Sequence, residues 1–224
     1  DIQLSTESWN YIWNSLAKYS PWKTLECIEF DNMDSTMLQM DQASFINTLR
    51  HFRFLQHLSL SNWNPPFCIN LKTFHYSFLL FQLILHKQNF SEPFNEKIQF
   101  PVTLNYIDLS GSSFTFVSLQ SFFKVLSSQI NQRQQLILCL ADLNLPSEHW
   151  PSFLRALPNL PAIKSLRGLD WSGNMIDGTQ LDVFCHYFLQ SNGIVHLKLD
   201  RIFNPQRIDD LKALINSIAE SSLI

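Results

Sequence analysis

The residues that could carry chemistry are carboxylates, histidines and cysteines scattered through 224 residues. Asp108 and Asp170 stand at the same place in two copies of one apolar pattern, and Glu29 stands there in a third. Paired carboxylates can serve acid–base catalysis. Aligned by that pattern, however, the two aspartates fall two strands apart, about 10 Å from each other. This is too wide for a retaining glycosidase pair, and no pocket is implied.

Histidine and cysteine form no recognisable constellation. His57 and His196 would point outward from strands too distant to share a ligand. The four cysteines lack CxxC pairs, which disfavours zinc and a disulfide framework and favours a reducing compartment. The pair Cys185-His186 has no second pair beside it, so a core thiol on a helix is the simpler interpretation. Motifs of the GxGxxG, GxxxxGK[ST], HExxH and GxSxG kinds are missing. We expect no enzyme, cofactor or metal.

Composition narrows the class further. The chain is 46% hydrophobic and only 16% charged, so it can bury a sizeable core and is not disordered. A net charge of −3 gives no reason to expect nucleic acid or an anionic membrane as partner. The longest mostly apolar run, residues 74–85, is too short to cross a bilayer, and no signal peptide opens the chain.

The elements that would position these residues follow a leucine-rich repeat. Residues 166–174 read LRGLDWSGN, an L-x-x-L-x-L-x-x-N pattern, with near-copies at 104–112 and 194–202. Alternating apolar residues of such a unit form an inward-facing strand with a period of two. Seven copies, about 28 residues apart, begin at Leu25, Leu55, Leu80, Leu104, Gln135, Leu166 and Ile194.

Amphipathic segments between these strands predict helices at 5–19, where Ser5 can cap the helix, and at about 41–52. The inward-facing residues expected for the helices are Phe45, Ile46 and Leu49; Leu119, Phe122, Phe123 and Leu126; Leu181, Phe184, Cys185 and Phe188; and Ile208, Leu211, Leu214, Ile215 and Ile218.

This pattern predicts one α/β domain over residues 1–224, a right-handed leucine-rich-repeat solenoid (horseshoe) of the ribonuclease-inhibitor type with about seven repeats. Helices are wider than strands, so the parallel sheet would be concave and the helices convex. Polar capping units are not evident, and Leu223 falls where another strand would begin. We therefore expect an interior fragment truncated at both ends.

The outward positions of repeats three to five are apolar, whereas charged and polar residues dominate those positions elsewhere. A contiguous apolar patch of this kind predicts a protein-partner site. The alternatives are an error of register in repeats three and five, or coverage by missing segments of the chain. The predicted partner-binding residues are Phe81, Ile84, Tyr106, Leu136, Ile137 and Cys139.

The run 166–178 and its continuation through 190–199 resemble the leucine-rich-repeat domain of the CARMIL family, which links actin capping protein and myosin I. An N-x-I-V-H-L-x-L strand follows the L-D-L-S-G-N motif in that family, and Asn192, Ile194, Val195, His196, Leu197 and Leu199 match it. The resemblance covers roughly residues 100–224, and Trp171 departs from the family's usual leucine.

The resemblance implies a non-catalytic protein-interaction scaffold of a cytoplasmic actin-cytoskeleton regulator, associated with the cell cortex. The family's pleckstrin-homology domain, dimerisation region and capping-protein-binding tail are not in this chain. The alternative is a sensor or inhibitor repeat domain of ribonuclease-inhibitor or immune-receptor type. A catalytic domain outside these residues is a third option, as in bacterial ligases that carry repeats.

Overall fold

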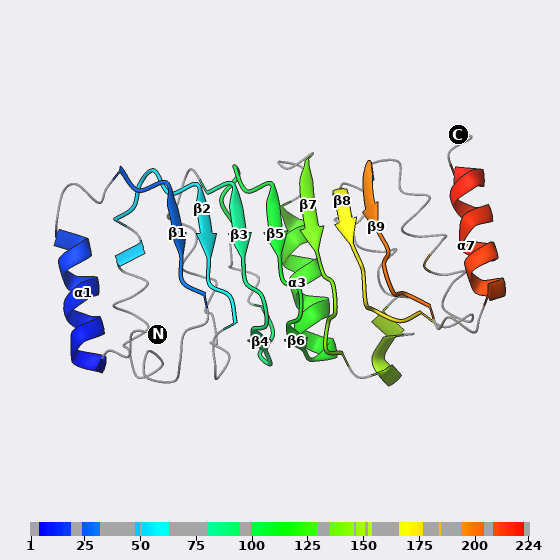
Figure 1. Cartoon of the computed structure of the whole chain (residues 1–224), viewed down its shortest axis with the longest axis horizontal. Helices are drawn as coiled ribbons and strands as arrows, with labels where there is room; N and C mark the ends of the chain where they lie inside the picture. The colour runs from blue at the N-terminus through cyan, green and yellow to red at the C-terminus, as the bar shows by residue number, and fades with distance from the viewer. Residues whose placement is uncertain are drawn as a thin grey trace.

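The computed structural model describes residues 5–18, 24–31, 48–49, 51–62, 80–94, 100–129, 135–145, 147–150, 152–153, 166–176, 184, 194–203 and 208–221. Within them the chain is an α/β protein built on a row of short parallel strands (Figure 1). The described elements, in chain order, are α1 (Thr6–Lys18), β1 (Cys27–Glu29), β2 (His57–Ser59), β3 (Gln82–Ile84), β4 (Asn89–Phe90), β5 (Tyr106–Asp108), β6 (Ser113–Phe114), α3 (Phe116–Ser128), β7 (Leu136–Cys139), a 3₁₀ turn (Ser147–His149), β8 (Leu166–Asp170), β9 (His196–Lys198) and α7 (Ile208–Ser221).

Seven of these strands form one sheet in the order β1-β2-β3-β5-β7-β8-β9, each parallel to its neighbour. Every predicted repeat contributes one strand, and the second apolar residue of each repeat pairs with its counterpart in the next, so the predicted register is confirmed. The paired residues are Ile28, Leu58, Leu83, Ile107, Leu138, Leu169 and Leu197. A second, two-stranded ladder pairs β4 with β6, where the rings of Phe90 and Phe114 stack at 4.7 Å.

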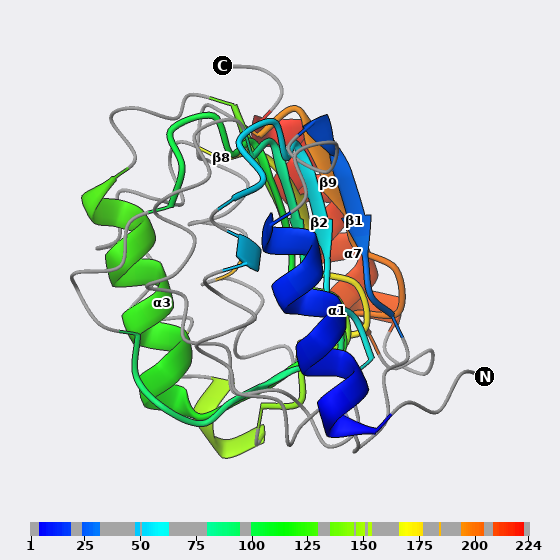
Figure 2. The ribbon, with the colours of Figure 1, turned by 90° about the vertical axis from the view of Figure 1, so that its left-hand side faces the viewer.

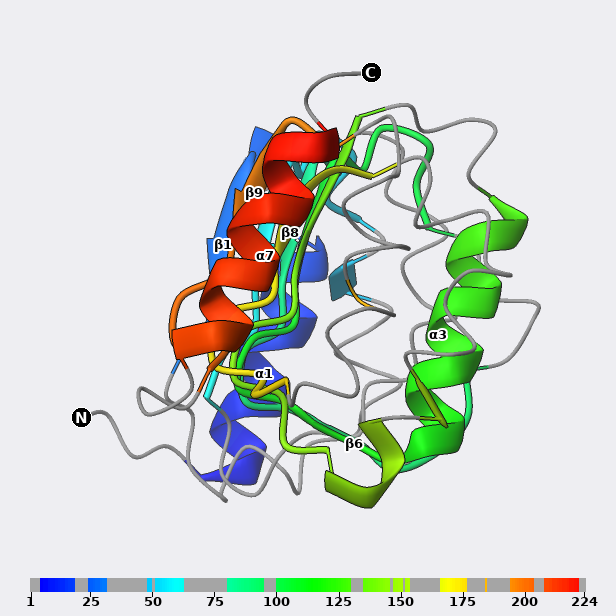
Figure 3. The ribbon, with the colours of Figure 1, turned by 90° about the vertical axis from the view of Figure 1, so that its right-hand side faces the viewer.

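One side of the large sheet faces the hydrophobic core. In Figures 2 and 3, α3 lies on that side, and no described helix covers the other. Thr115 caps α3 by accepting a hydrogen bond from the backbone N–H of Ser118 at 3.1 Å. The predicted inward residues of this helix are all buried, namely Leu119, Phe122, Phe123 and Leu126.

Helices also stand at both ends of the row of strands (Figure 1). The first agrees with the predicted 5–19 helix: Ser5 accepts the backbone N–H of Ser8 at 3.2 Å, and Trp13 is fully buried against Phe30. No described helix is long and apolar enough to span a membrane.

The inward face predicted for α7 is wrong for most of its residues. Ile208, Leu211 and Ile215 are 62%, 46% and 55% exposed, and only Leu214 is buried. Helical periodicity identifies an apolar face but does not supply an element to cover it, and no described segment packs there. Ile218 lies outside the described side chains, as do Phe45, Ile46, Leu181, Cys185 and Phe188; Leu49 and Phe184 are buried as predicted.

Trp171 replaces the usual leucine of the repeat and is accommodated by other rings. Its side chain is fully buried, stacked on Phe153 at 6.3 Å and in edge contact with Trp150 at 5.4 Å. Phe184 packs on it at 6.0 Å. The larger indole therefore enlarges an aromatic cluster beneath β8.

Asn174 fills the asparagine position of repeat six, and its side chain forms hydrogen bonds with the backbone of repeat five. Buried Asn174 donates from Nδ2 to the carbonyl of Leu140 at 2.6 Å and accepts the N–H of Leu143 at 2.8 Å through Oδ1. One side chain thus satisfies a donor and an acceptor of the preceding turn, which would be costly to bury without partners.

Equivalent residues in earlier repeats use other side chains for the same purpose. Ser112 donates to the carbonyl of Leu85 at 3.1 Å and accepts the N–H of Gln88 at 3.0 Å. Gln88 in turn donates from Nε2 to the carbonyl of Leu60 at 2.8 Å. In these three repeats a serine, a glutamine or an asparagine serves this role, whereas repeats five and seven have the apolar residues Leu143 and Ile202 at the position.

We predict that Asn174→Ala lowers the free energy of unfolding by about 3 kcal/mol, because two buried backbone groups lose their side-chain partner. Urea denaturation followed by circular dichroism measures the change. Asn105→Ala, at an exposed asparagine, is the matched control and should change stability by less than about 0.5 kcal/mol. Equal effects of the two substitutions would contradict this role for Asn174.

Candidate functional site on the open face of the sheet

The candidate site is the side of the seven-stranded sheet opposite α3, which we call the open face (Figure 2). The first and third residues of the paired strand segments point to it, while the residues between them enter the core. Its residues, in pairs from β1 to β9, are Cys27 and Glu29, His57 and Ser59, Gln82 and Ile84, Tyr106 and Asp108, Ile137 and Cys139, Gly168 and Asp170, and His196 and Lys198.

Most of the predicted patch does lie together on this face. Tyr106 pairs with Ile137 on the next strand, and both side chains are partly exposed. Ile84, also partly exposed, lies on β3, and Phe81, just before that strand, is 37% exposed. Cys139 is on the same face but only 8% exposed, and its thiol donates to the hydroxyl of Tyr106 at 3.4 Å. That this patch binds a partner stays a prediction.

Leu136 was predicted to point outward, and this is wrong. It is fully buried and pairs with Leu166, whereas the next pair is Ile137 with Gly168. Repeat five is therefore one residue shorter here than the L-x-x-L spacing of β8, and Arg167 of β8 stands opposite the step from 136 to 137. The irregularity puts Leu136 in the core place that the repeat pattern assigned to residue 135.

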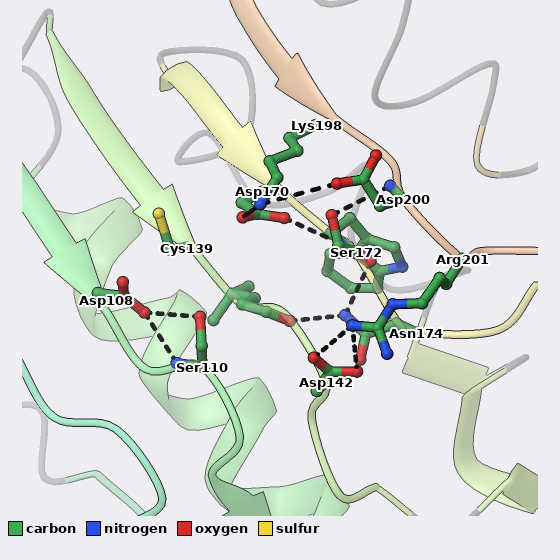
Figure 4. Close-up of polar contacts among 12 residues, drawn as sticks. Asp108, Ser110, Cys139, Asp142, Asp170, Ser172, Asn174, Lys198, Asp200 and Arg201 are labelled. Atoms are coloured by element: carbon green, nitrogen blue, oxygen red, sulfur yellow. Dashed lines mark hydrogen bonds and ion pairs between the residues drawn. The ribbon is translucent and has the colours of Figure 1, made fainter. Parts of the chain in front are cut away.

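Asp108 is the most constrained charged group at the centre of the face. Its Oδ1 accepts the backbone N–H and the hydroxyl of Ser110 at 3.0 and 2.6 Å (Figure 4). Its Oδ2 lies 2.8 Å from Nε2 of His86 and 3.2 Å from the hydroxyl of Tyr106. Four polar contacts thus hold a carboxylate whose side chain is only 12% exposed.

These contacts set the proton affinities of the cluster. Burial by itself would raise the pKa of Asp108, but hydrogen bonds from His86 and Ser110 outweigh it, and the pKa is lowered. The same carboxylate raises the pKa of His86 against the opposing effect of burial. Burial also raises the pKa of Tyr106 and raises that of Cys139 to about 11. Both of these groups are therefore protonated at neutral pH.

Asp170 lies on the same face with different partners. It accepts the backbone N–H of Ser172 at 3.0 Å and pairs with Lys198 at 3.2 Å, and that lysine also reaches Asp200 at 3.8 Å (Figure 4). Cys139 on β7 stands between Asp108 and Asp170 in the register. The two aspartates are thus two strands apart, as the repeat spacing predicted, and share no hydrogen-bonding partner among the described residues.

A further ion pair, in the turns that follow the strands, joins repeat seven to repeat five across repeat six. Arg201 binds both carboxylate oxygens of Asp142 at 2.8 and 3.0 Å, passing over the turn of the intervening repeat (Figure 4). That turn contains Gly173 with φ +74°, where an added Cβ would lie 1.9 Å from Oδ1 of Asp142. Glycine therefore leaves room for this carboxylate, and both charged side chains remain largely exposed to solvent.

The first two strands carry a cluster that the sequence analysis did not assemble. Cys27 donates to Oε1 of Glu29 at 3.8 Å, and Nε2 of His57 lies 3.2 Å from the same oxygen. Burial and the neighbouring Glu29 raise the pKa of the Cys27 thiol. The signal was available in the repeat alignment, because residues 27 and 57 occupy one position of adjacent units. His57 was considered only as a possible co-ligand of His196, which lies on a distant strand, and not with Cys27 on the adjacent one.

We predict that the His86–Asp108 pair makes stability depend on pH. Because the pKa of His86 is raised above its ordinary 6.5, the pair's contribution is complete below that pH and is lost as pH rises through the higher, folded-state value. The contribution of Asp108, whose pKa is lowered, is present above its ordinary 3.8 and is lost as pH falls through the lowered value.

Urea denaturation between pH 6 and pH 8 should show a decrease in unfolding free energy of less than about 1 kcal/mol, since the side chain of His86 is 38% exposed. His86→Gln should flatten this profile. His196→Gln, at an exposed histidine of the same face, should preserve it. A profile that His86→Gln leaves unchanged would mean that another group causes the dependence.

Comparison with known proteins gives a likeness to solved structures. No family model and no curated protein matches the chain. Among solved structures, the C-terminal domain of tropomodulin from Caenorhabditis elegans aligns with a TM-score of 0.35 and 10% sequence identity. The alignment covers 98% of this chain and 94% of that one.

Proposed function

We propose that this chain is a non-catalytic protein-interaction domain, a leucine-rich-repeat horseshoe of the ribonuclease-inhibitor type whose open face is the concave docking surface. The observation that carries the proposal is the open face itself: seven adjacent parallel strands present two rows of side chains that no described helix covers. Helices about 10 Å wide behind strands about 4.8 Å apart favour curvature toward the strands.

The chemistry of the open face supports a protein partner. Its middle strands carry the apolar side chains Ile84, Tyr106 and Ile137, and Phe81, which is exposed, immediately precedes β3; we call these four residues the central patch. Charged side chains flank it on both sides: Glu29 toward the first strand, and the pair Asp170–Lys198 toward the last. An apolar centre containing a tyrosine, with a polar rim, is the usual anatomy of a protein–protein interface.

The resemblance of residues 166–199 to CARMIL proteins directs the proposal toward the actin cytoskeleton. The matched motifs supply β8 and β9, which are neighbours in the sheet. On this basis we propose that the chain belongs to a cytoplasmic regulator at the cell cortex that acts on actin capping protein, with the repeat domain as scaffold and docking surface. Dimerisation in such a protein would come from regions outside these residues.

The central patch can be tested with Phe81→Asp combined with Ile137→Asp. We expect this double variant to reduce the recovery of an actin-regulatory partner from cell extract by at least about tenfold, because interface anchors commonly contribute over 1 kcal/mol each. Pull-down on the immobilised chain followed by mass spectrometry identifies the partner, and titration with the purified partner gives the affinity.

The matched control is Val195→Asp, since Val195 stands at the repeat position of Phe81 but is 67% exposed and far along the sheet. It should bind as the wild type does, and circular dichroism should show native spectra for all variants. Undiminished binding by the double variant would place the docking surface elsewhere. Enrichment of partners unrelated to actin would contradict the cytoskeletal part of the proposal.

A further inference from the structure

The cluster on β1 and β2 brings together three side chains of the kinds that bind transition metals. Sγ of Cys27, a carboxylate oxygen of Glu29 and a ring nitrogen of His57 all lie within 4.8 Å of one another. Cys27 and Glu29 are two apart on one strand, so they share a face, and His57 is the direct cross-strand partner of Cys27. The sheet itself therefore fixes the arrangement.

The separations suit tetrahedral coordination. With Zn–S near 2.3 Å and Zn–N and Zn–O near 2.1 Å, tetrahedral ligands lie about 3.6 Å apart for sulfur and oxygen and about 3.4 Å for nitrogen and oxygen. The cluster shows 3.8 Å from Cys27 Sγ to Glu29 Oε1 and 3.2 Å from His57 Nε2 to the same oxygen. These two separations lie within a few tenths of an ångström of the tetrahedral values, and all three ligand atoms lie within 4.8 Å of one another.

The imidazole of His57 is already oriented for such an ion. Its Nδ1 lies 2.8 Å from Oε1 of Gln82 on the next strand. An amide oxygen only accepts, so Nδ1 carries the proton and donates it. In the neutral ring, Nε2 then presents its lone pair to the carboxylate of Glu29. Two acceptors facing each other at this distance need a proton or a cation between them, and metal-bound histidines are commonly held by such an outer hydrogen bond.

We propose that Cys27, Glu29 and His57 form a binding site for a zinc-type divalent cation, with Gln82 as the residue that positions the histidine. One thiolate, one carboxylate and one imidazole are a donor set that Zn²⁺ accepts, and the two anionic ligands balance its charge. The Cys27 thiol gives its proton to solvent when the Sγ–metal bond forms. Because Cys27 and Glu29 are exposed, water can occupy the fourth position.

The site departs from the expectation based on cysteine spacing. Local CxxC pairs are one way to assemble a zinc site, but a repeat protein can draw ligands from adjacent units through strand pairing. The site lies on the same open face as the central patch, with Gln82 preceding Ile84 on β3. It does not depend on the proposed partner.

Titration of the purified chain with Co²⁺ tests the proposal, with Zn²⁺ as competitor. We expect one equivalent of Co²⁺ to give thiolate-to-metal charge-transfer absorption in the near ultraviolet, which Zn²⁺ abolishes. Cys27→Ser should remove that absorption, and Glu29→Gln and His57→Ala should weaken Co²⁺ binding at least tenfold. Gln82→Leu should weaken it about 10- to 100-fold while leaving the circular dichroism spectrum unchanged.

Cys139→Ser is the matched control, because Cys139 lies on the same face but four strands from Cys27, and its thiol is hydrogen-bonded to Tyr106. It should bind Co²⁺ as the wild type does. Absence of the charge-transfer band in the wild type would overturn the proposal. So would a band that persists in Cys27→Ser, since it would then arise from another cysteine.

Discussion

The packing of equivalent apolar residues in adjacent strands is the interaction on which the structure depends. Leu83, Ile107 and Leu138 are fully buried and directly paired, and each covers the next. Most strands of the large sheet have only three residues, too few to be stable alone, so every unit depends on its neighbours. A shift of one residue would expose this row and bury the charges of the open face, which fixes the register. The outward residues are then free to differ between repeats, and they carry the chemistry.

The turns that follow the strands obey a second constraint, which links the fold to its surface charges. The same turn position has positive φ in each of six described repeats, at Asn62, Lys87, Gly111, Asp142, Gly173 and Arg201. Five of these residues donate their N–H to a carbonyl of the next repeat at 2.7–3.0 Å. These hydrogen bonds offset the energetic cost of a left-handed backbone conformation at residues other than glycine. Because Asp142, Gly173 and Arg201 occupy this same turn position in three successive repeats, the two charged residues lie on either side of the glycine. The shared backbone conformation of the turns therefore places the ion pair.

Apolar spacing was sufficient to predict the seven strands and the pairing of their central residues, and helical periodicity located α1, with Ser5 as its cap, and α3. The failures have identifiable causes. The position of Leu136 follows from a spacing in repeat five that is one residue shorter than the L-x-x-L of the other units, and a fixed repeat template cannot represent this difference. The apolar face of α7 has the predicted period but no described element to cover it. Site prediction was weaker, because the contact of His86 with Asp108 joins a turn of one repeat to a strand of the next. Such contacts follow from the register only when neighbouring repeats are compared position by position.

The electrostatics of the open face are compatible with the proposed role in recognition. A general acid or base works best when its pKa lies near the working pH and its proton can reach a substrate. Asp108 has a lowered pKa, and its carboxylate oxygens are already engaged with Ser110, His86 and Tyr106. Asp170 is paired with Lys198. Tyr106 and Cys139 have raised pKa values and stay protonated. Groups so fixed before any ligand arrives lose little conformational freedom on association, which is the condition for selective binding by a rigid surface. The same preorganisation holds His57 toward Cys27 and Glu29, so both proposals rest on side chains that the register of the sheet has already placed.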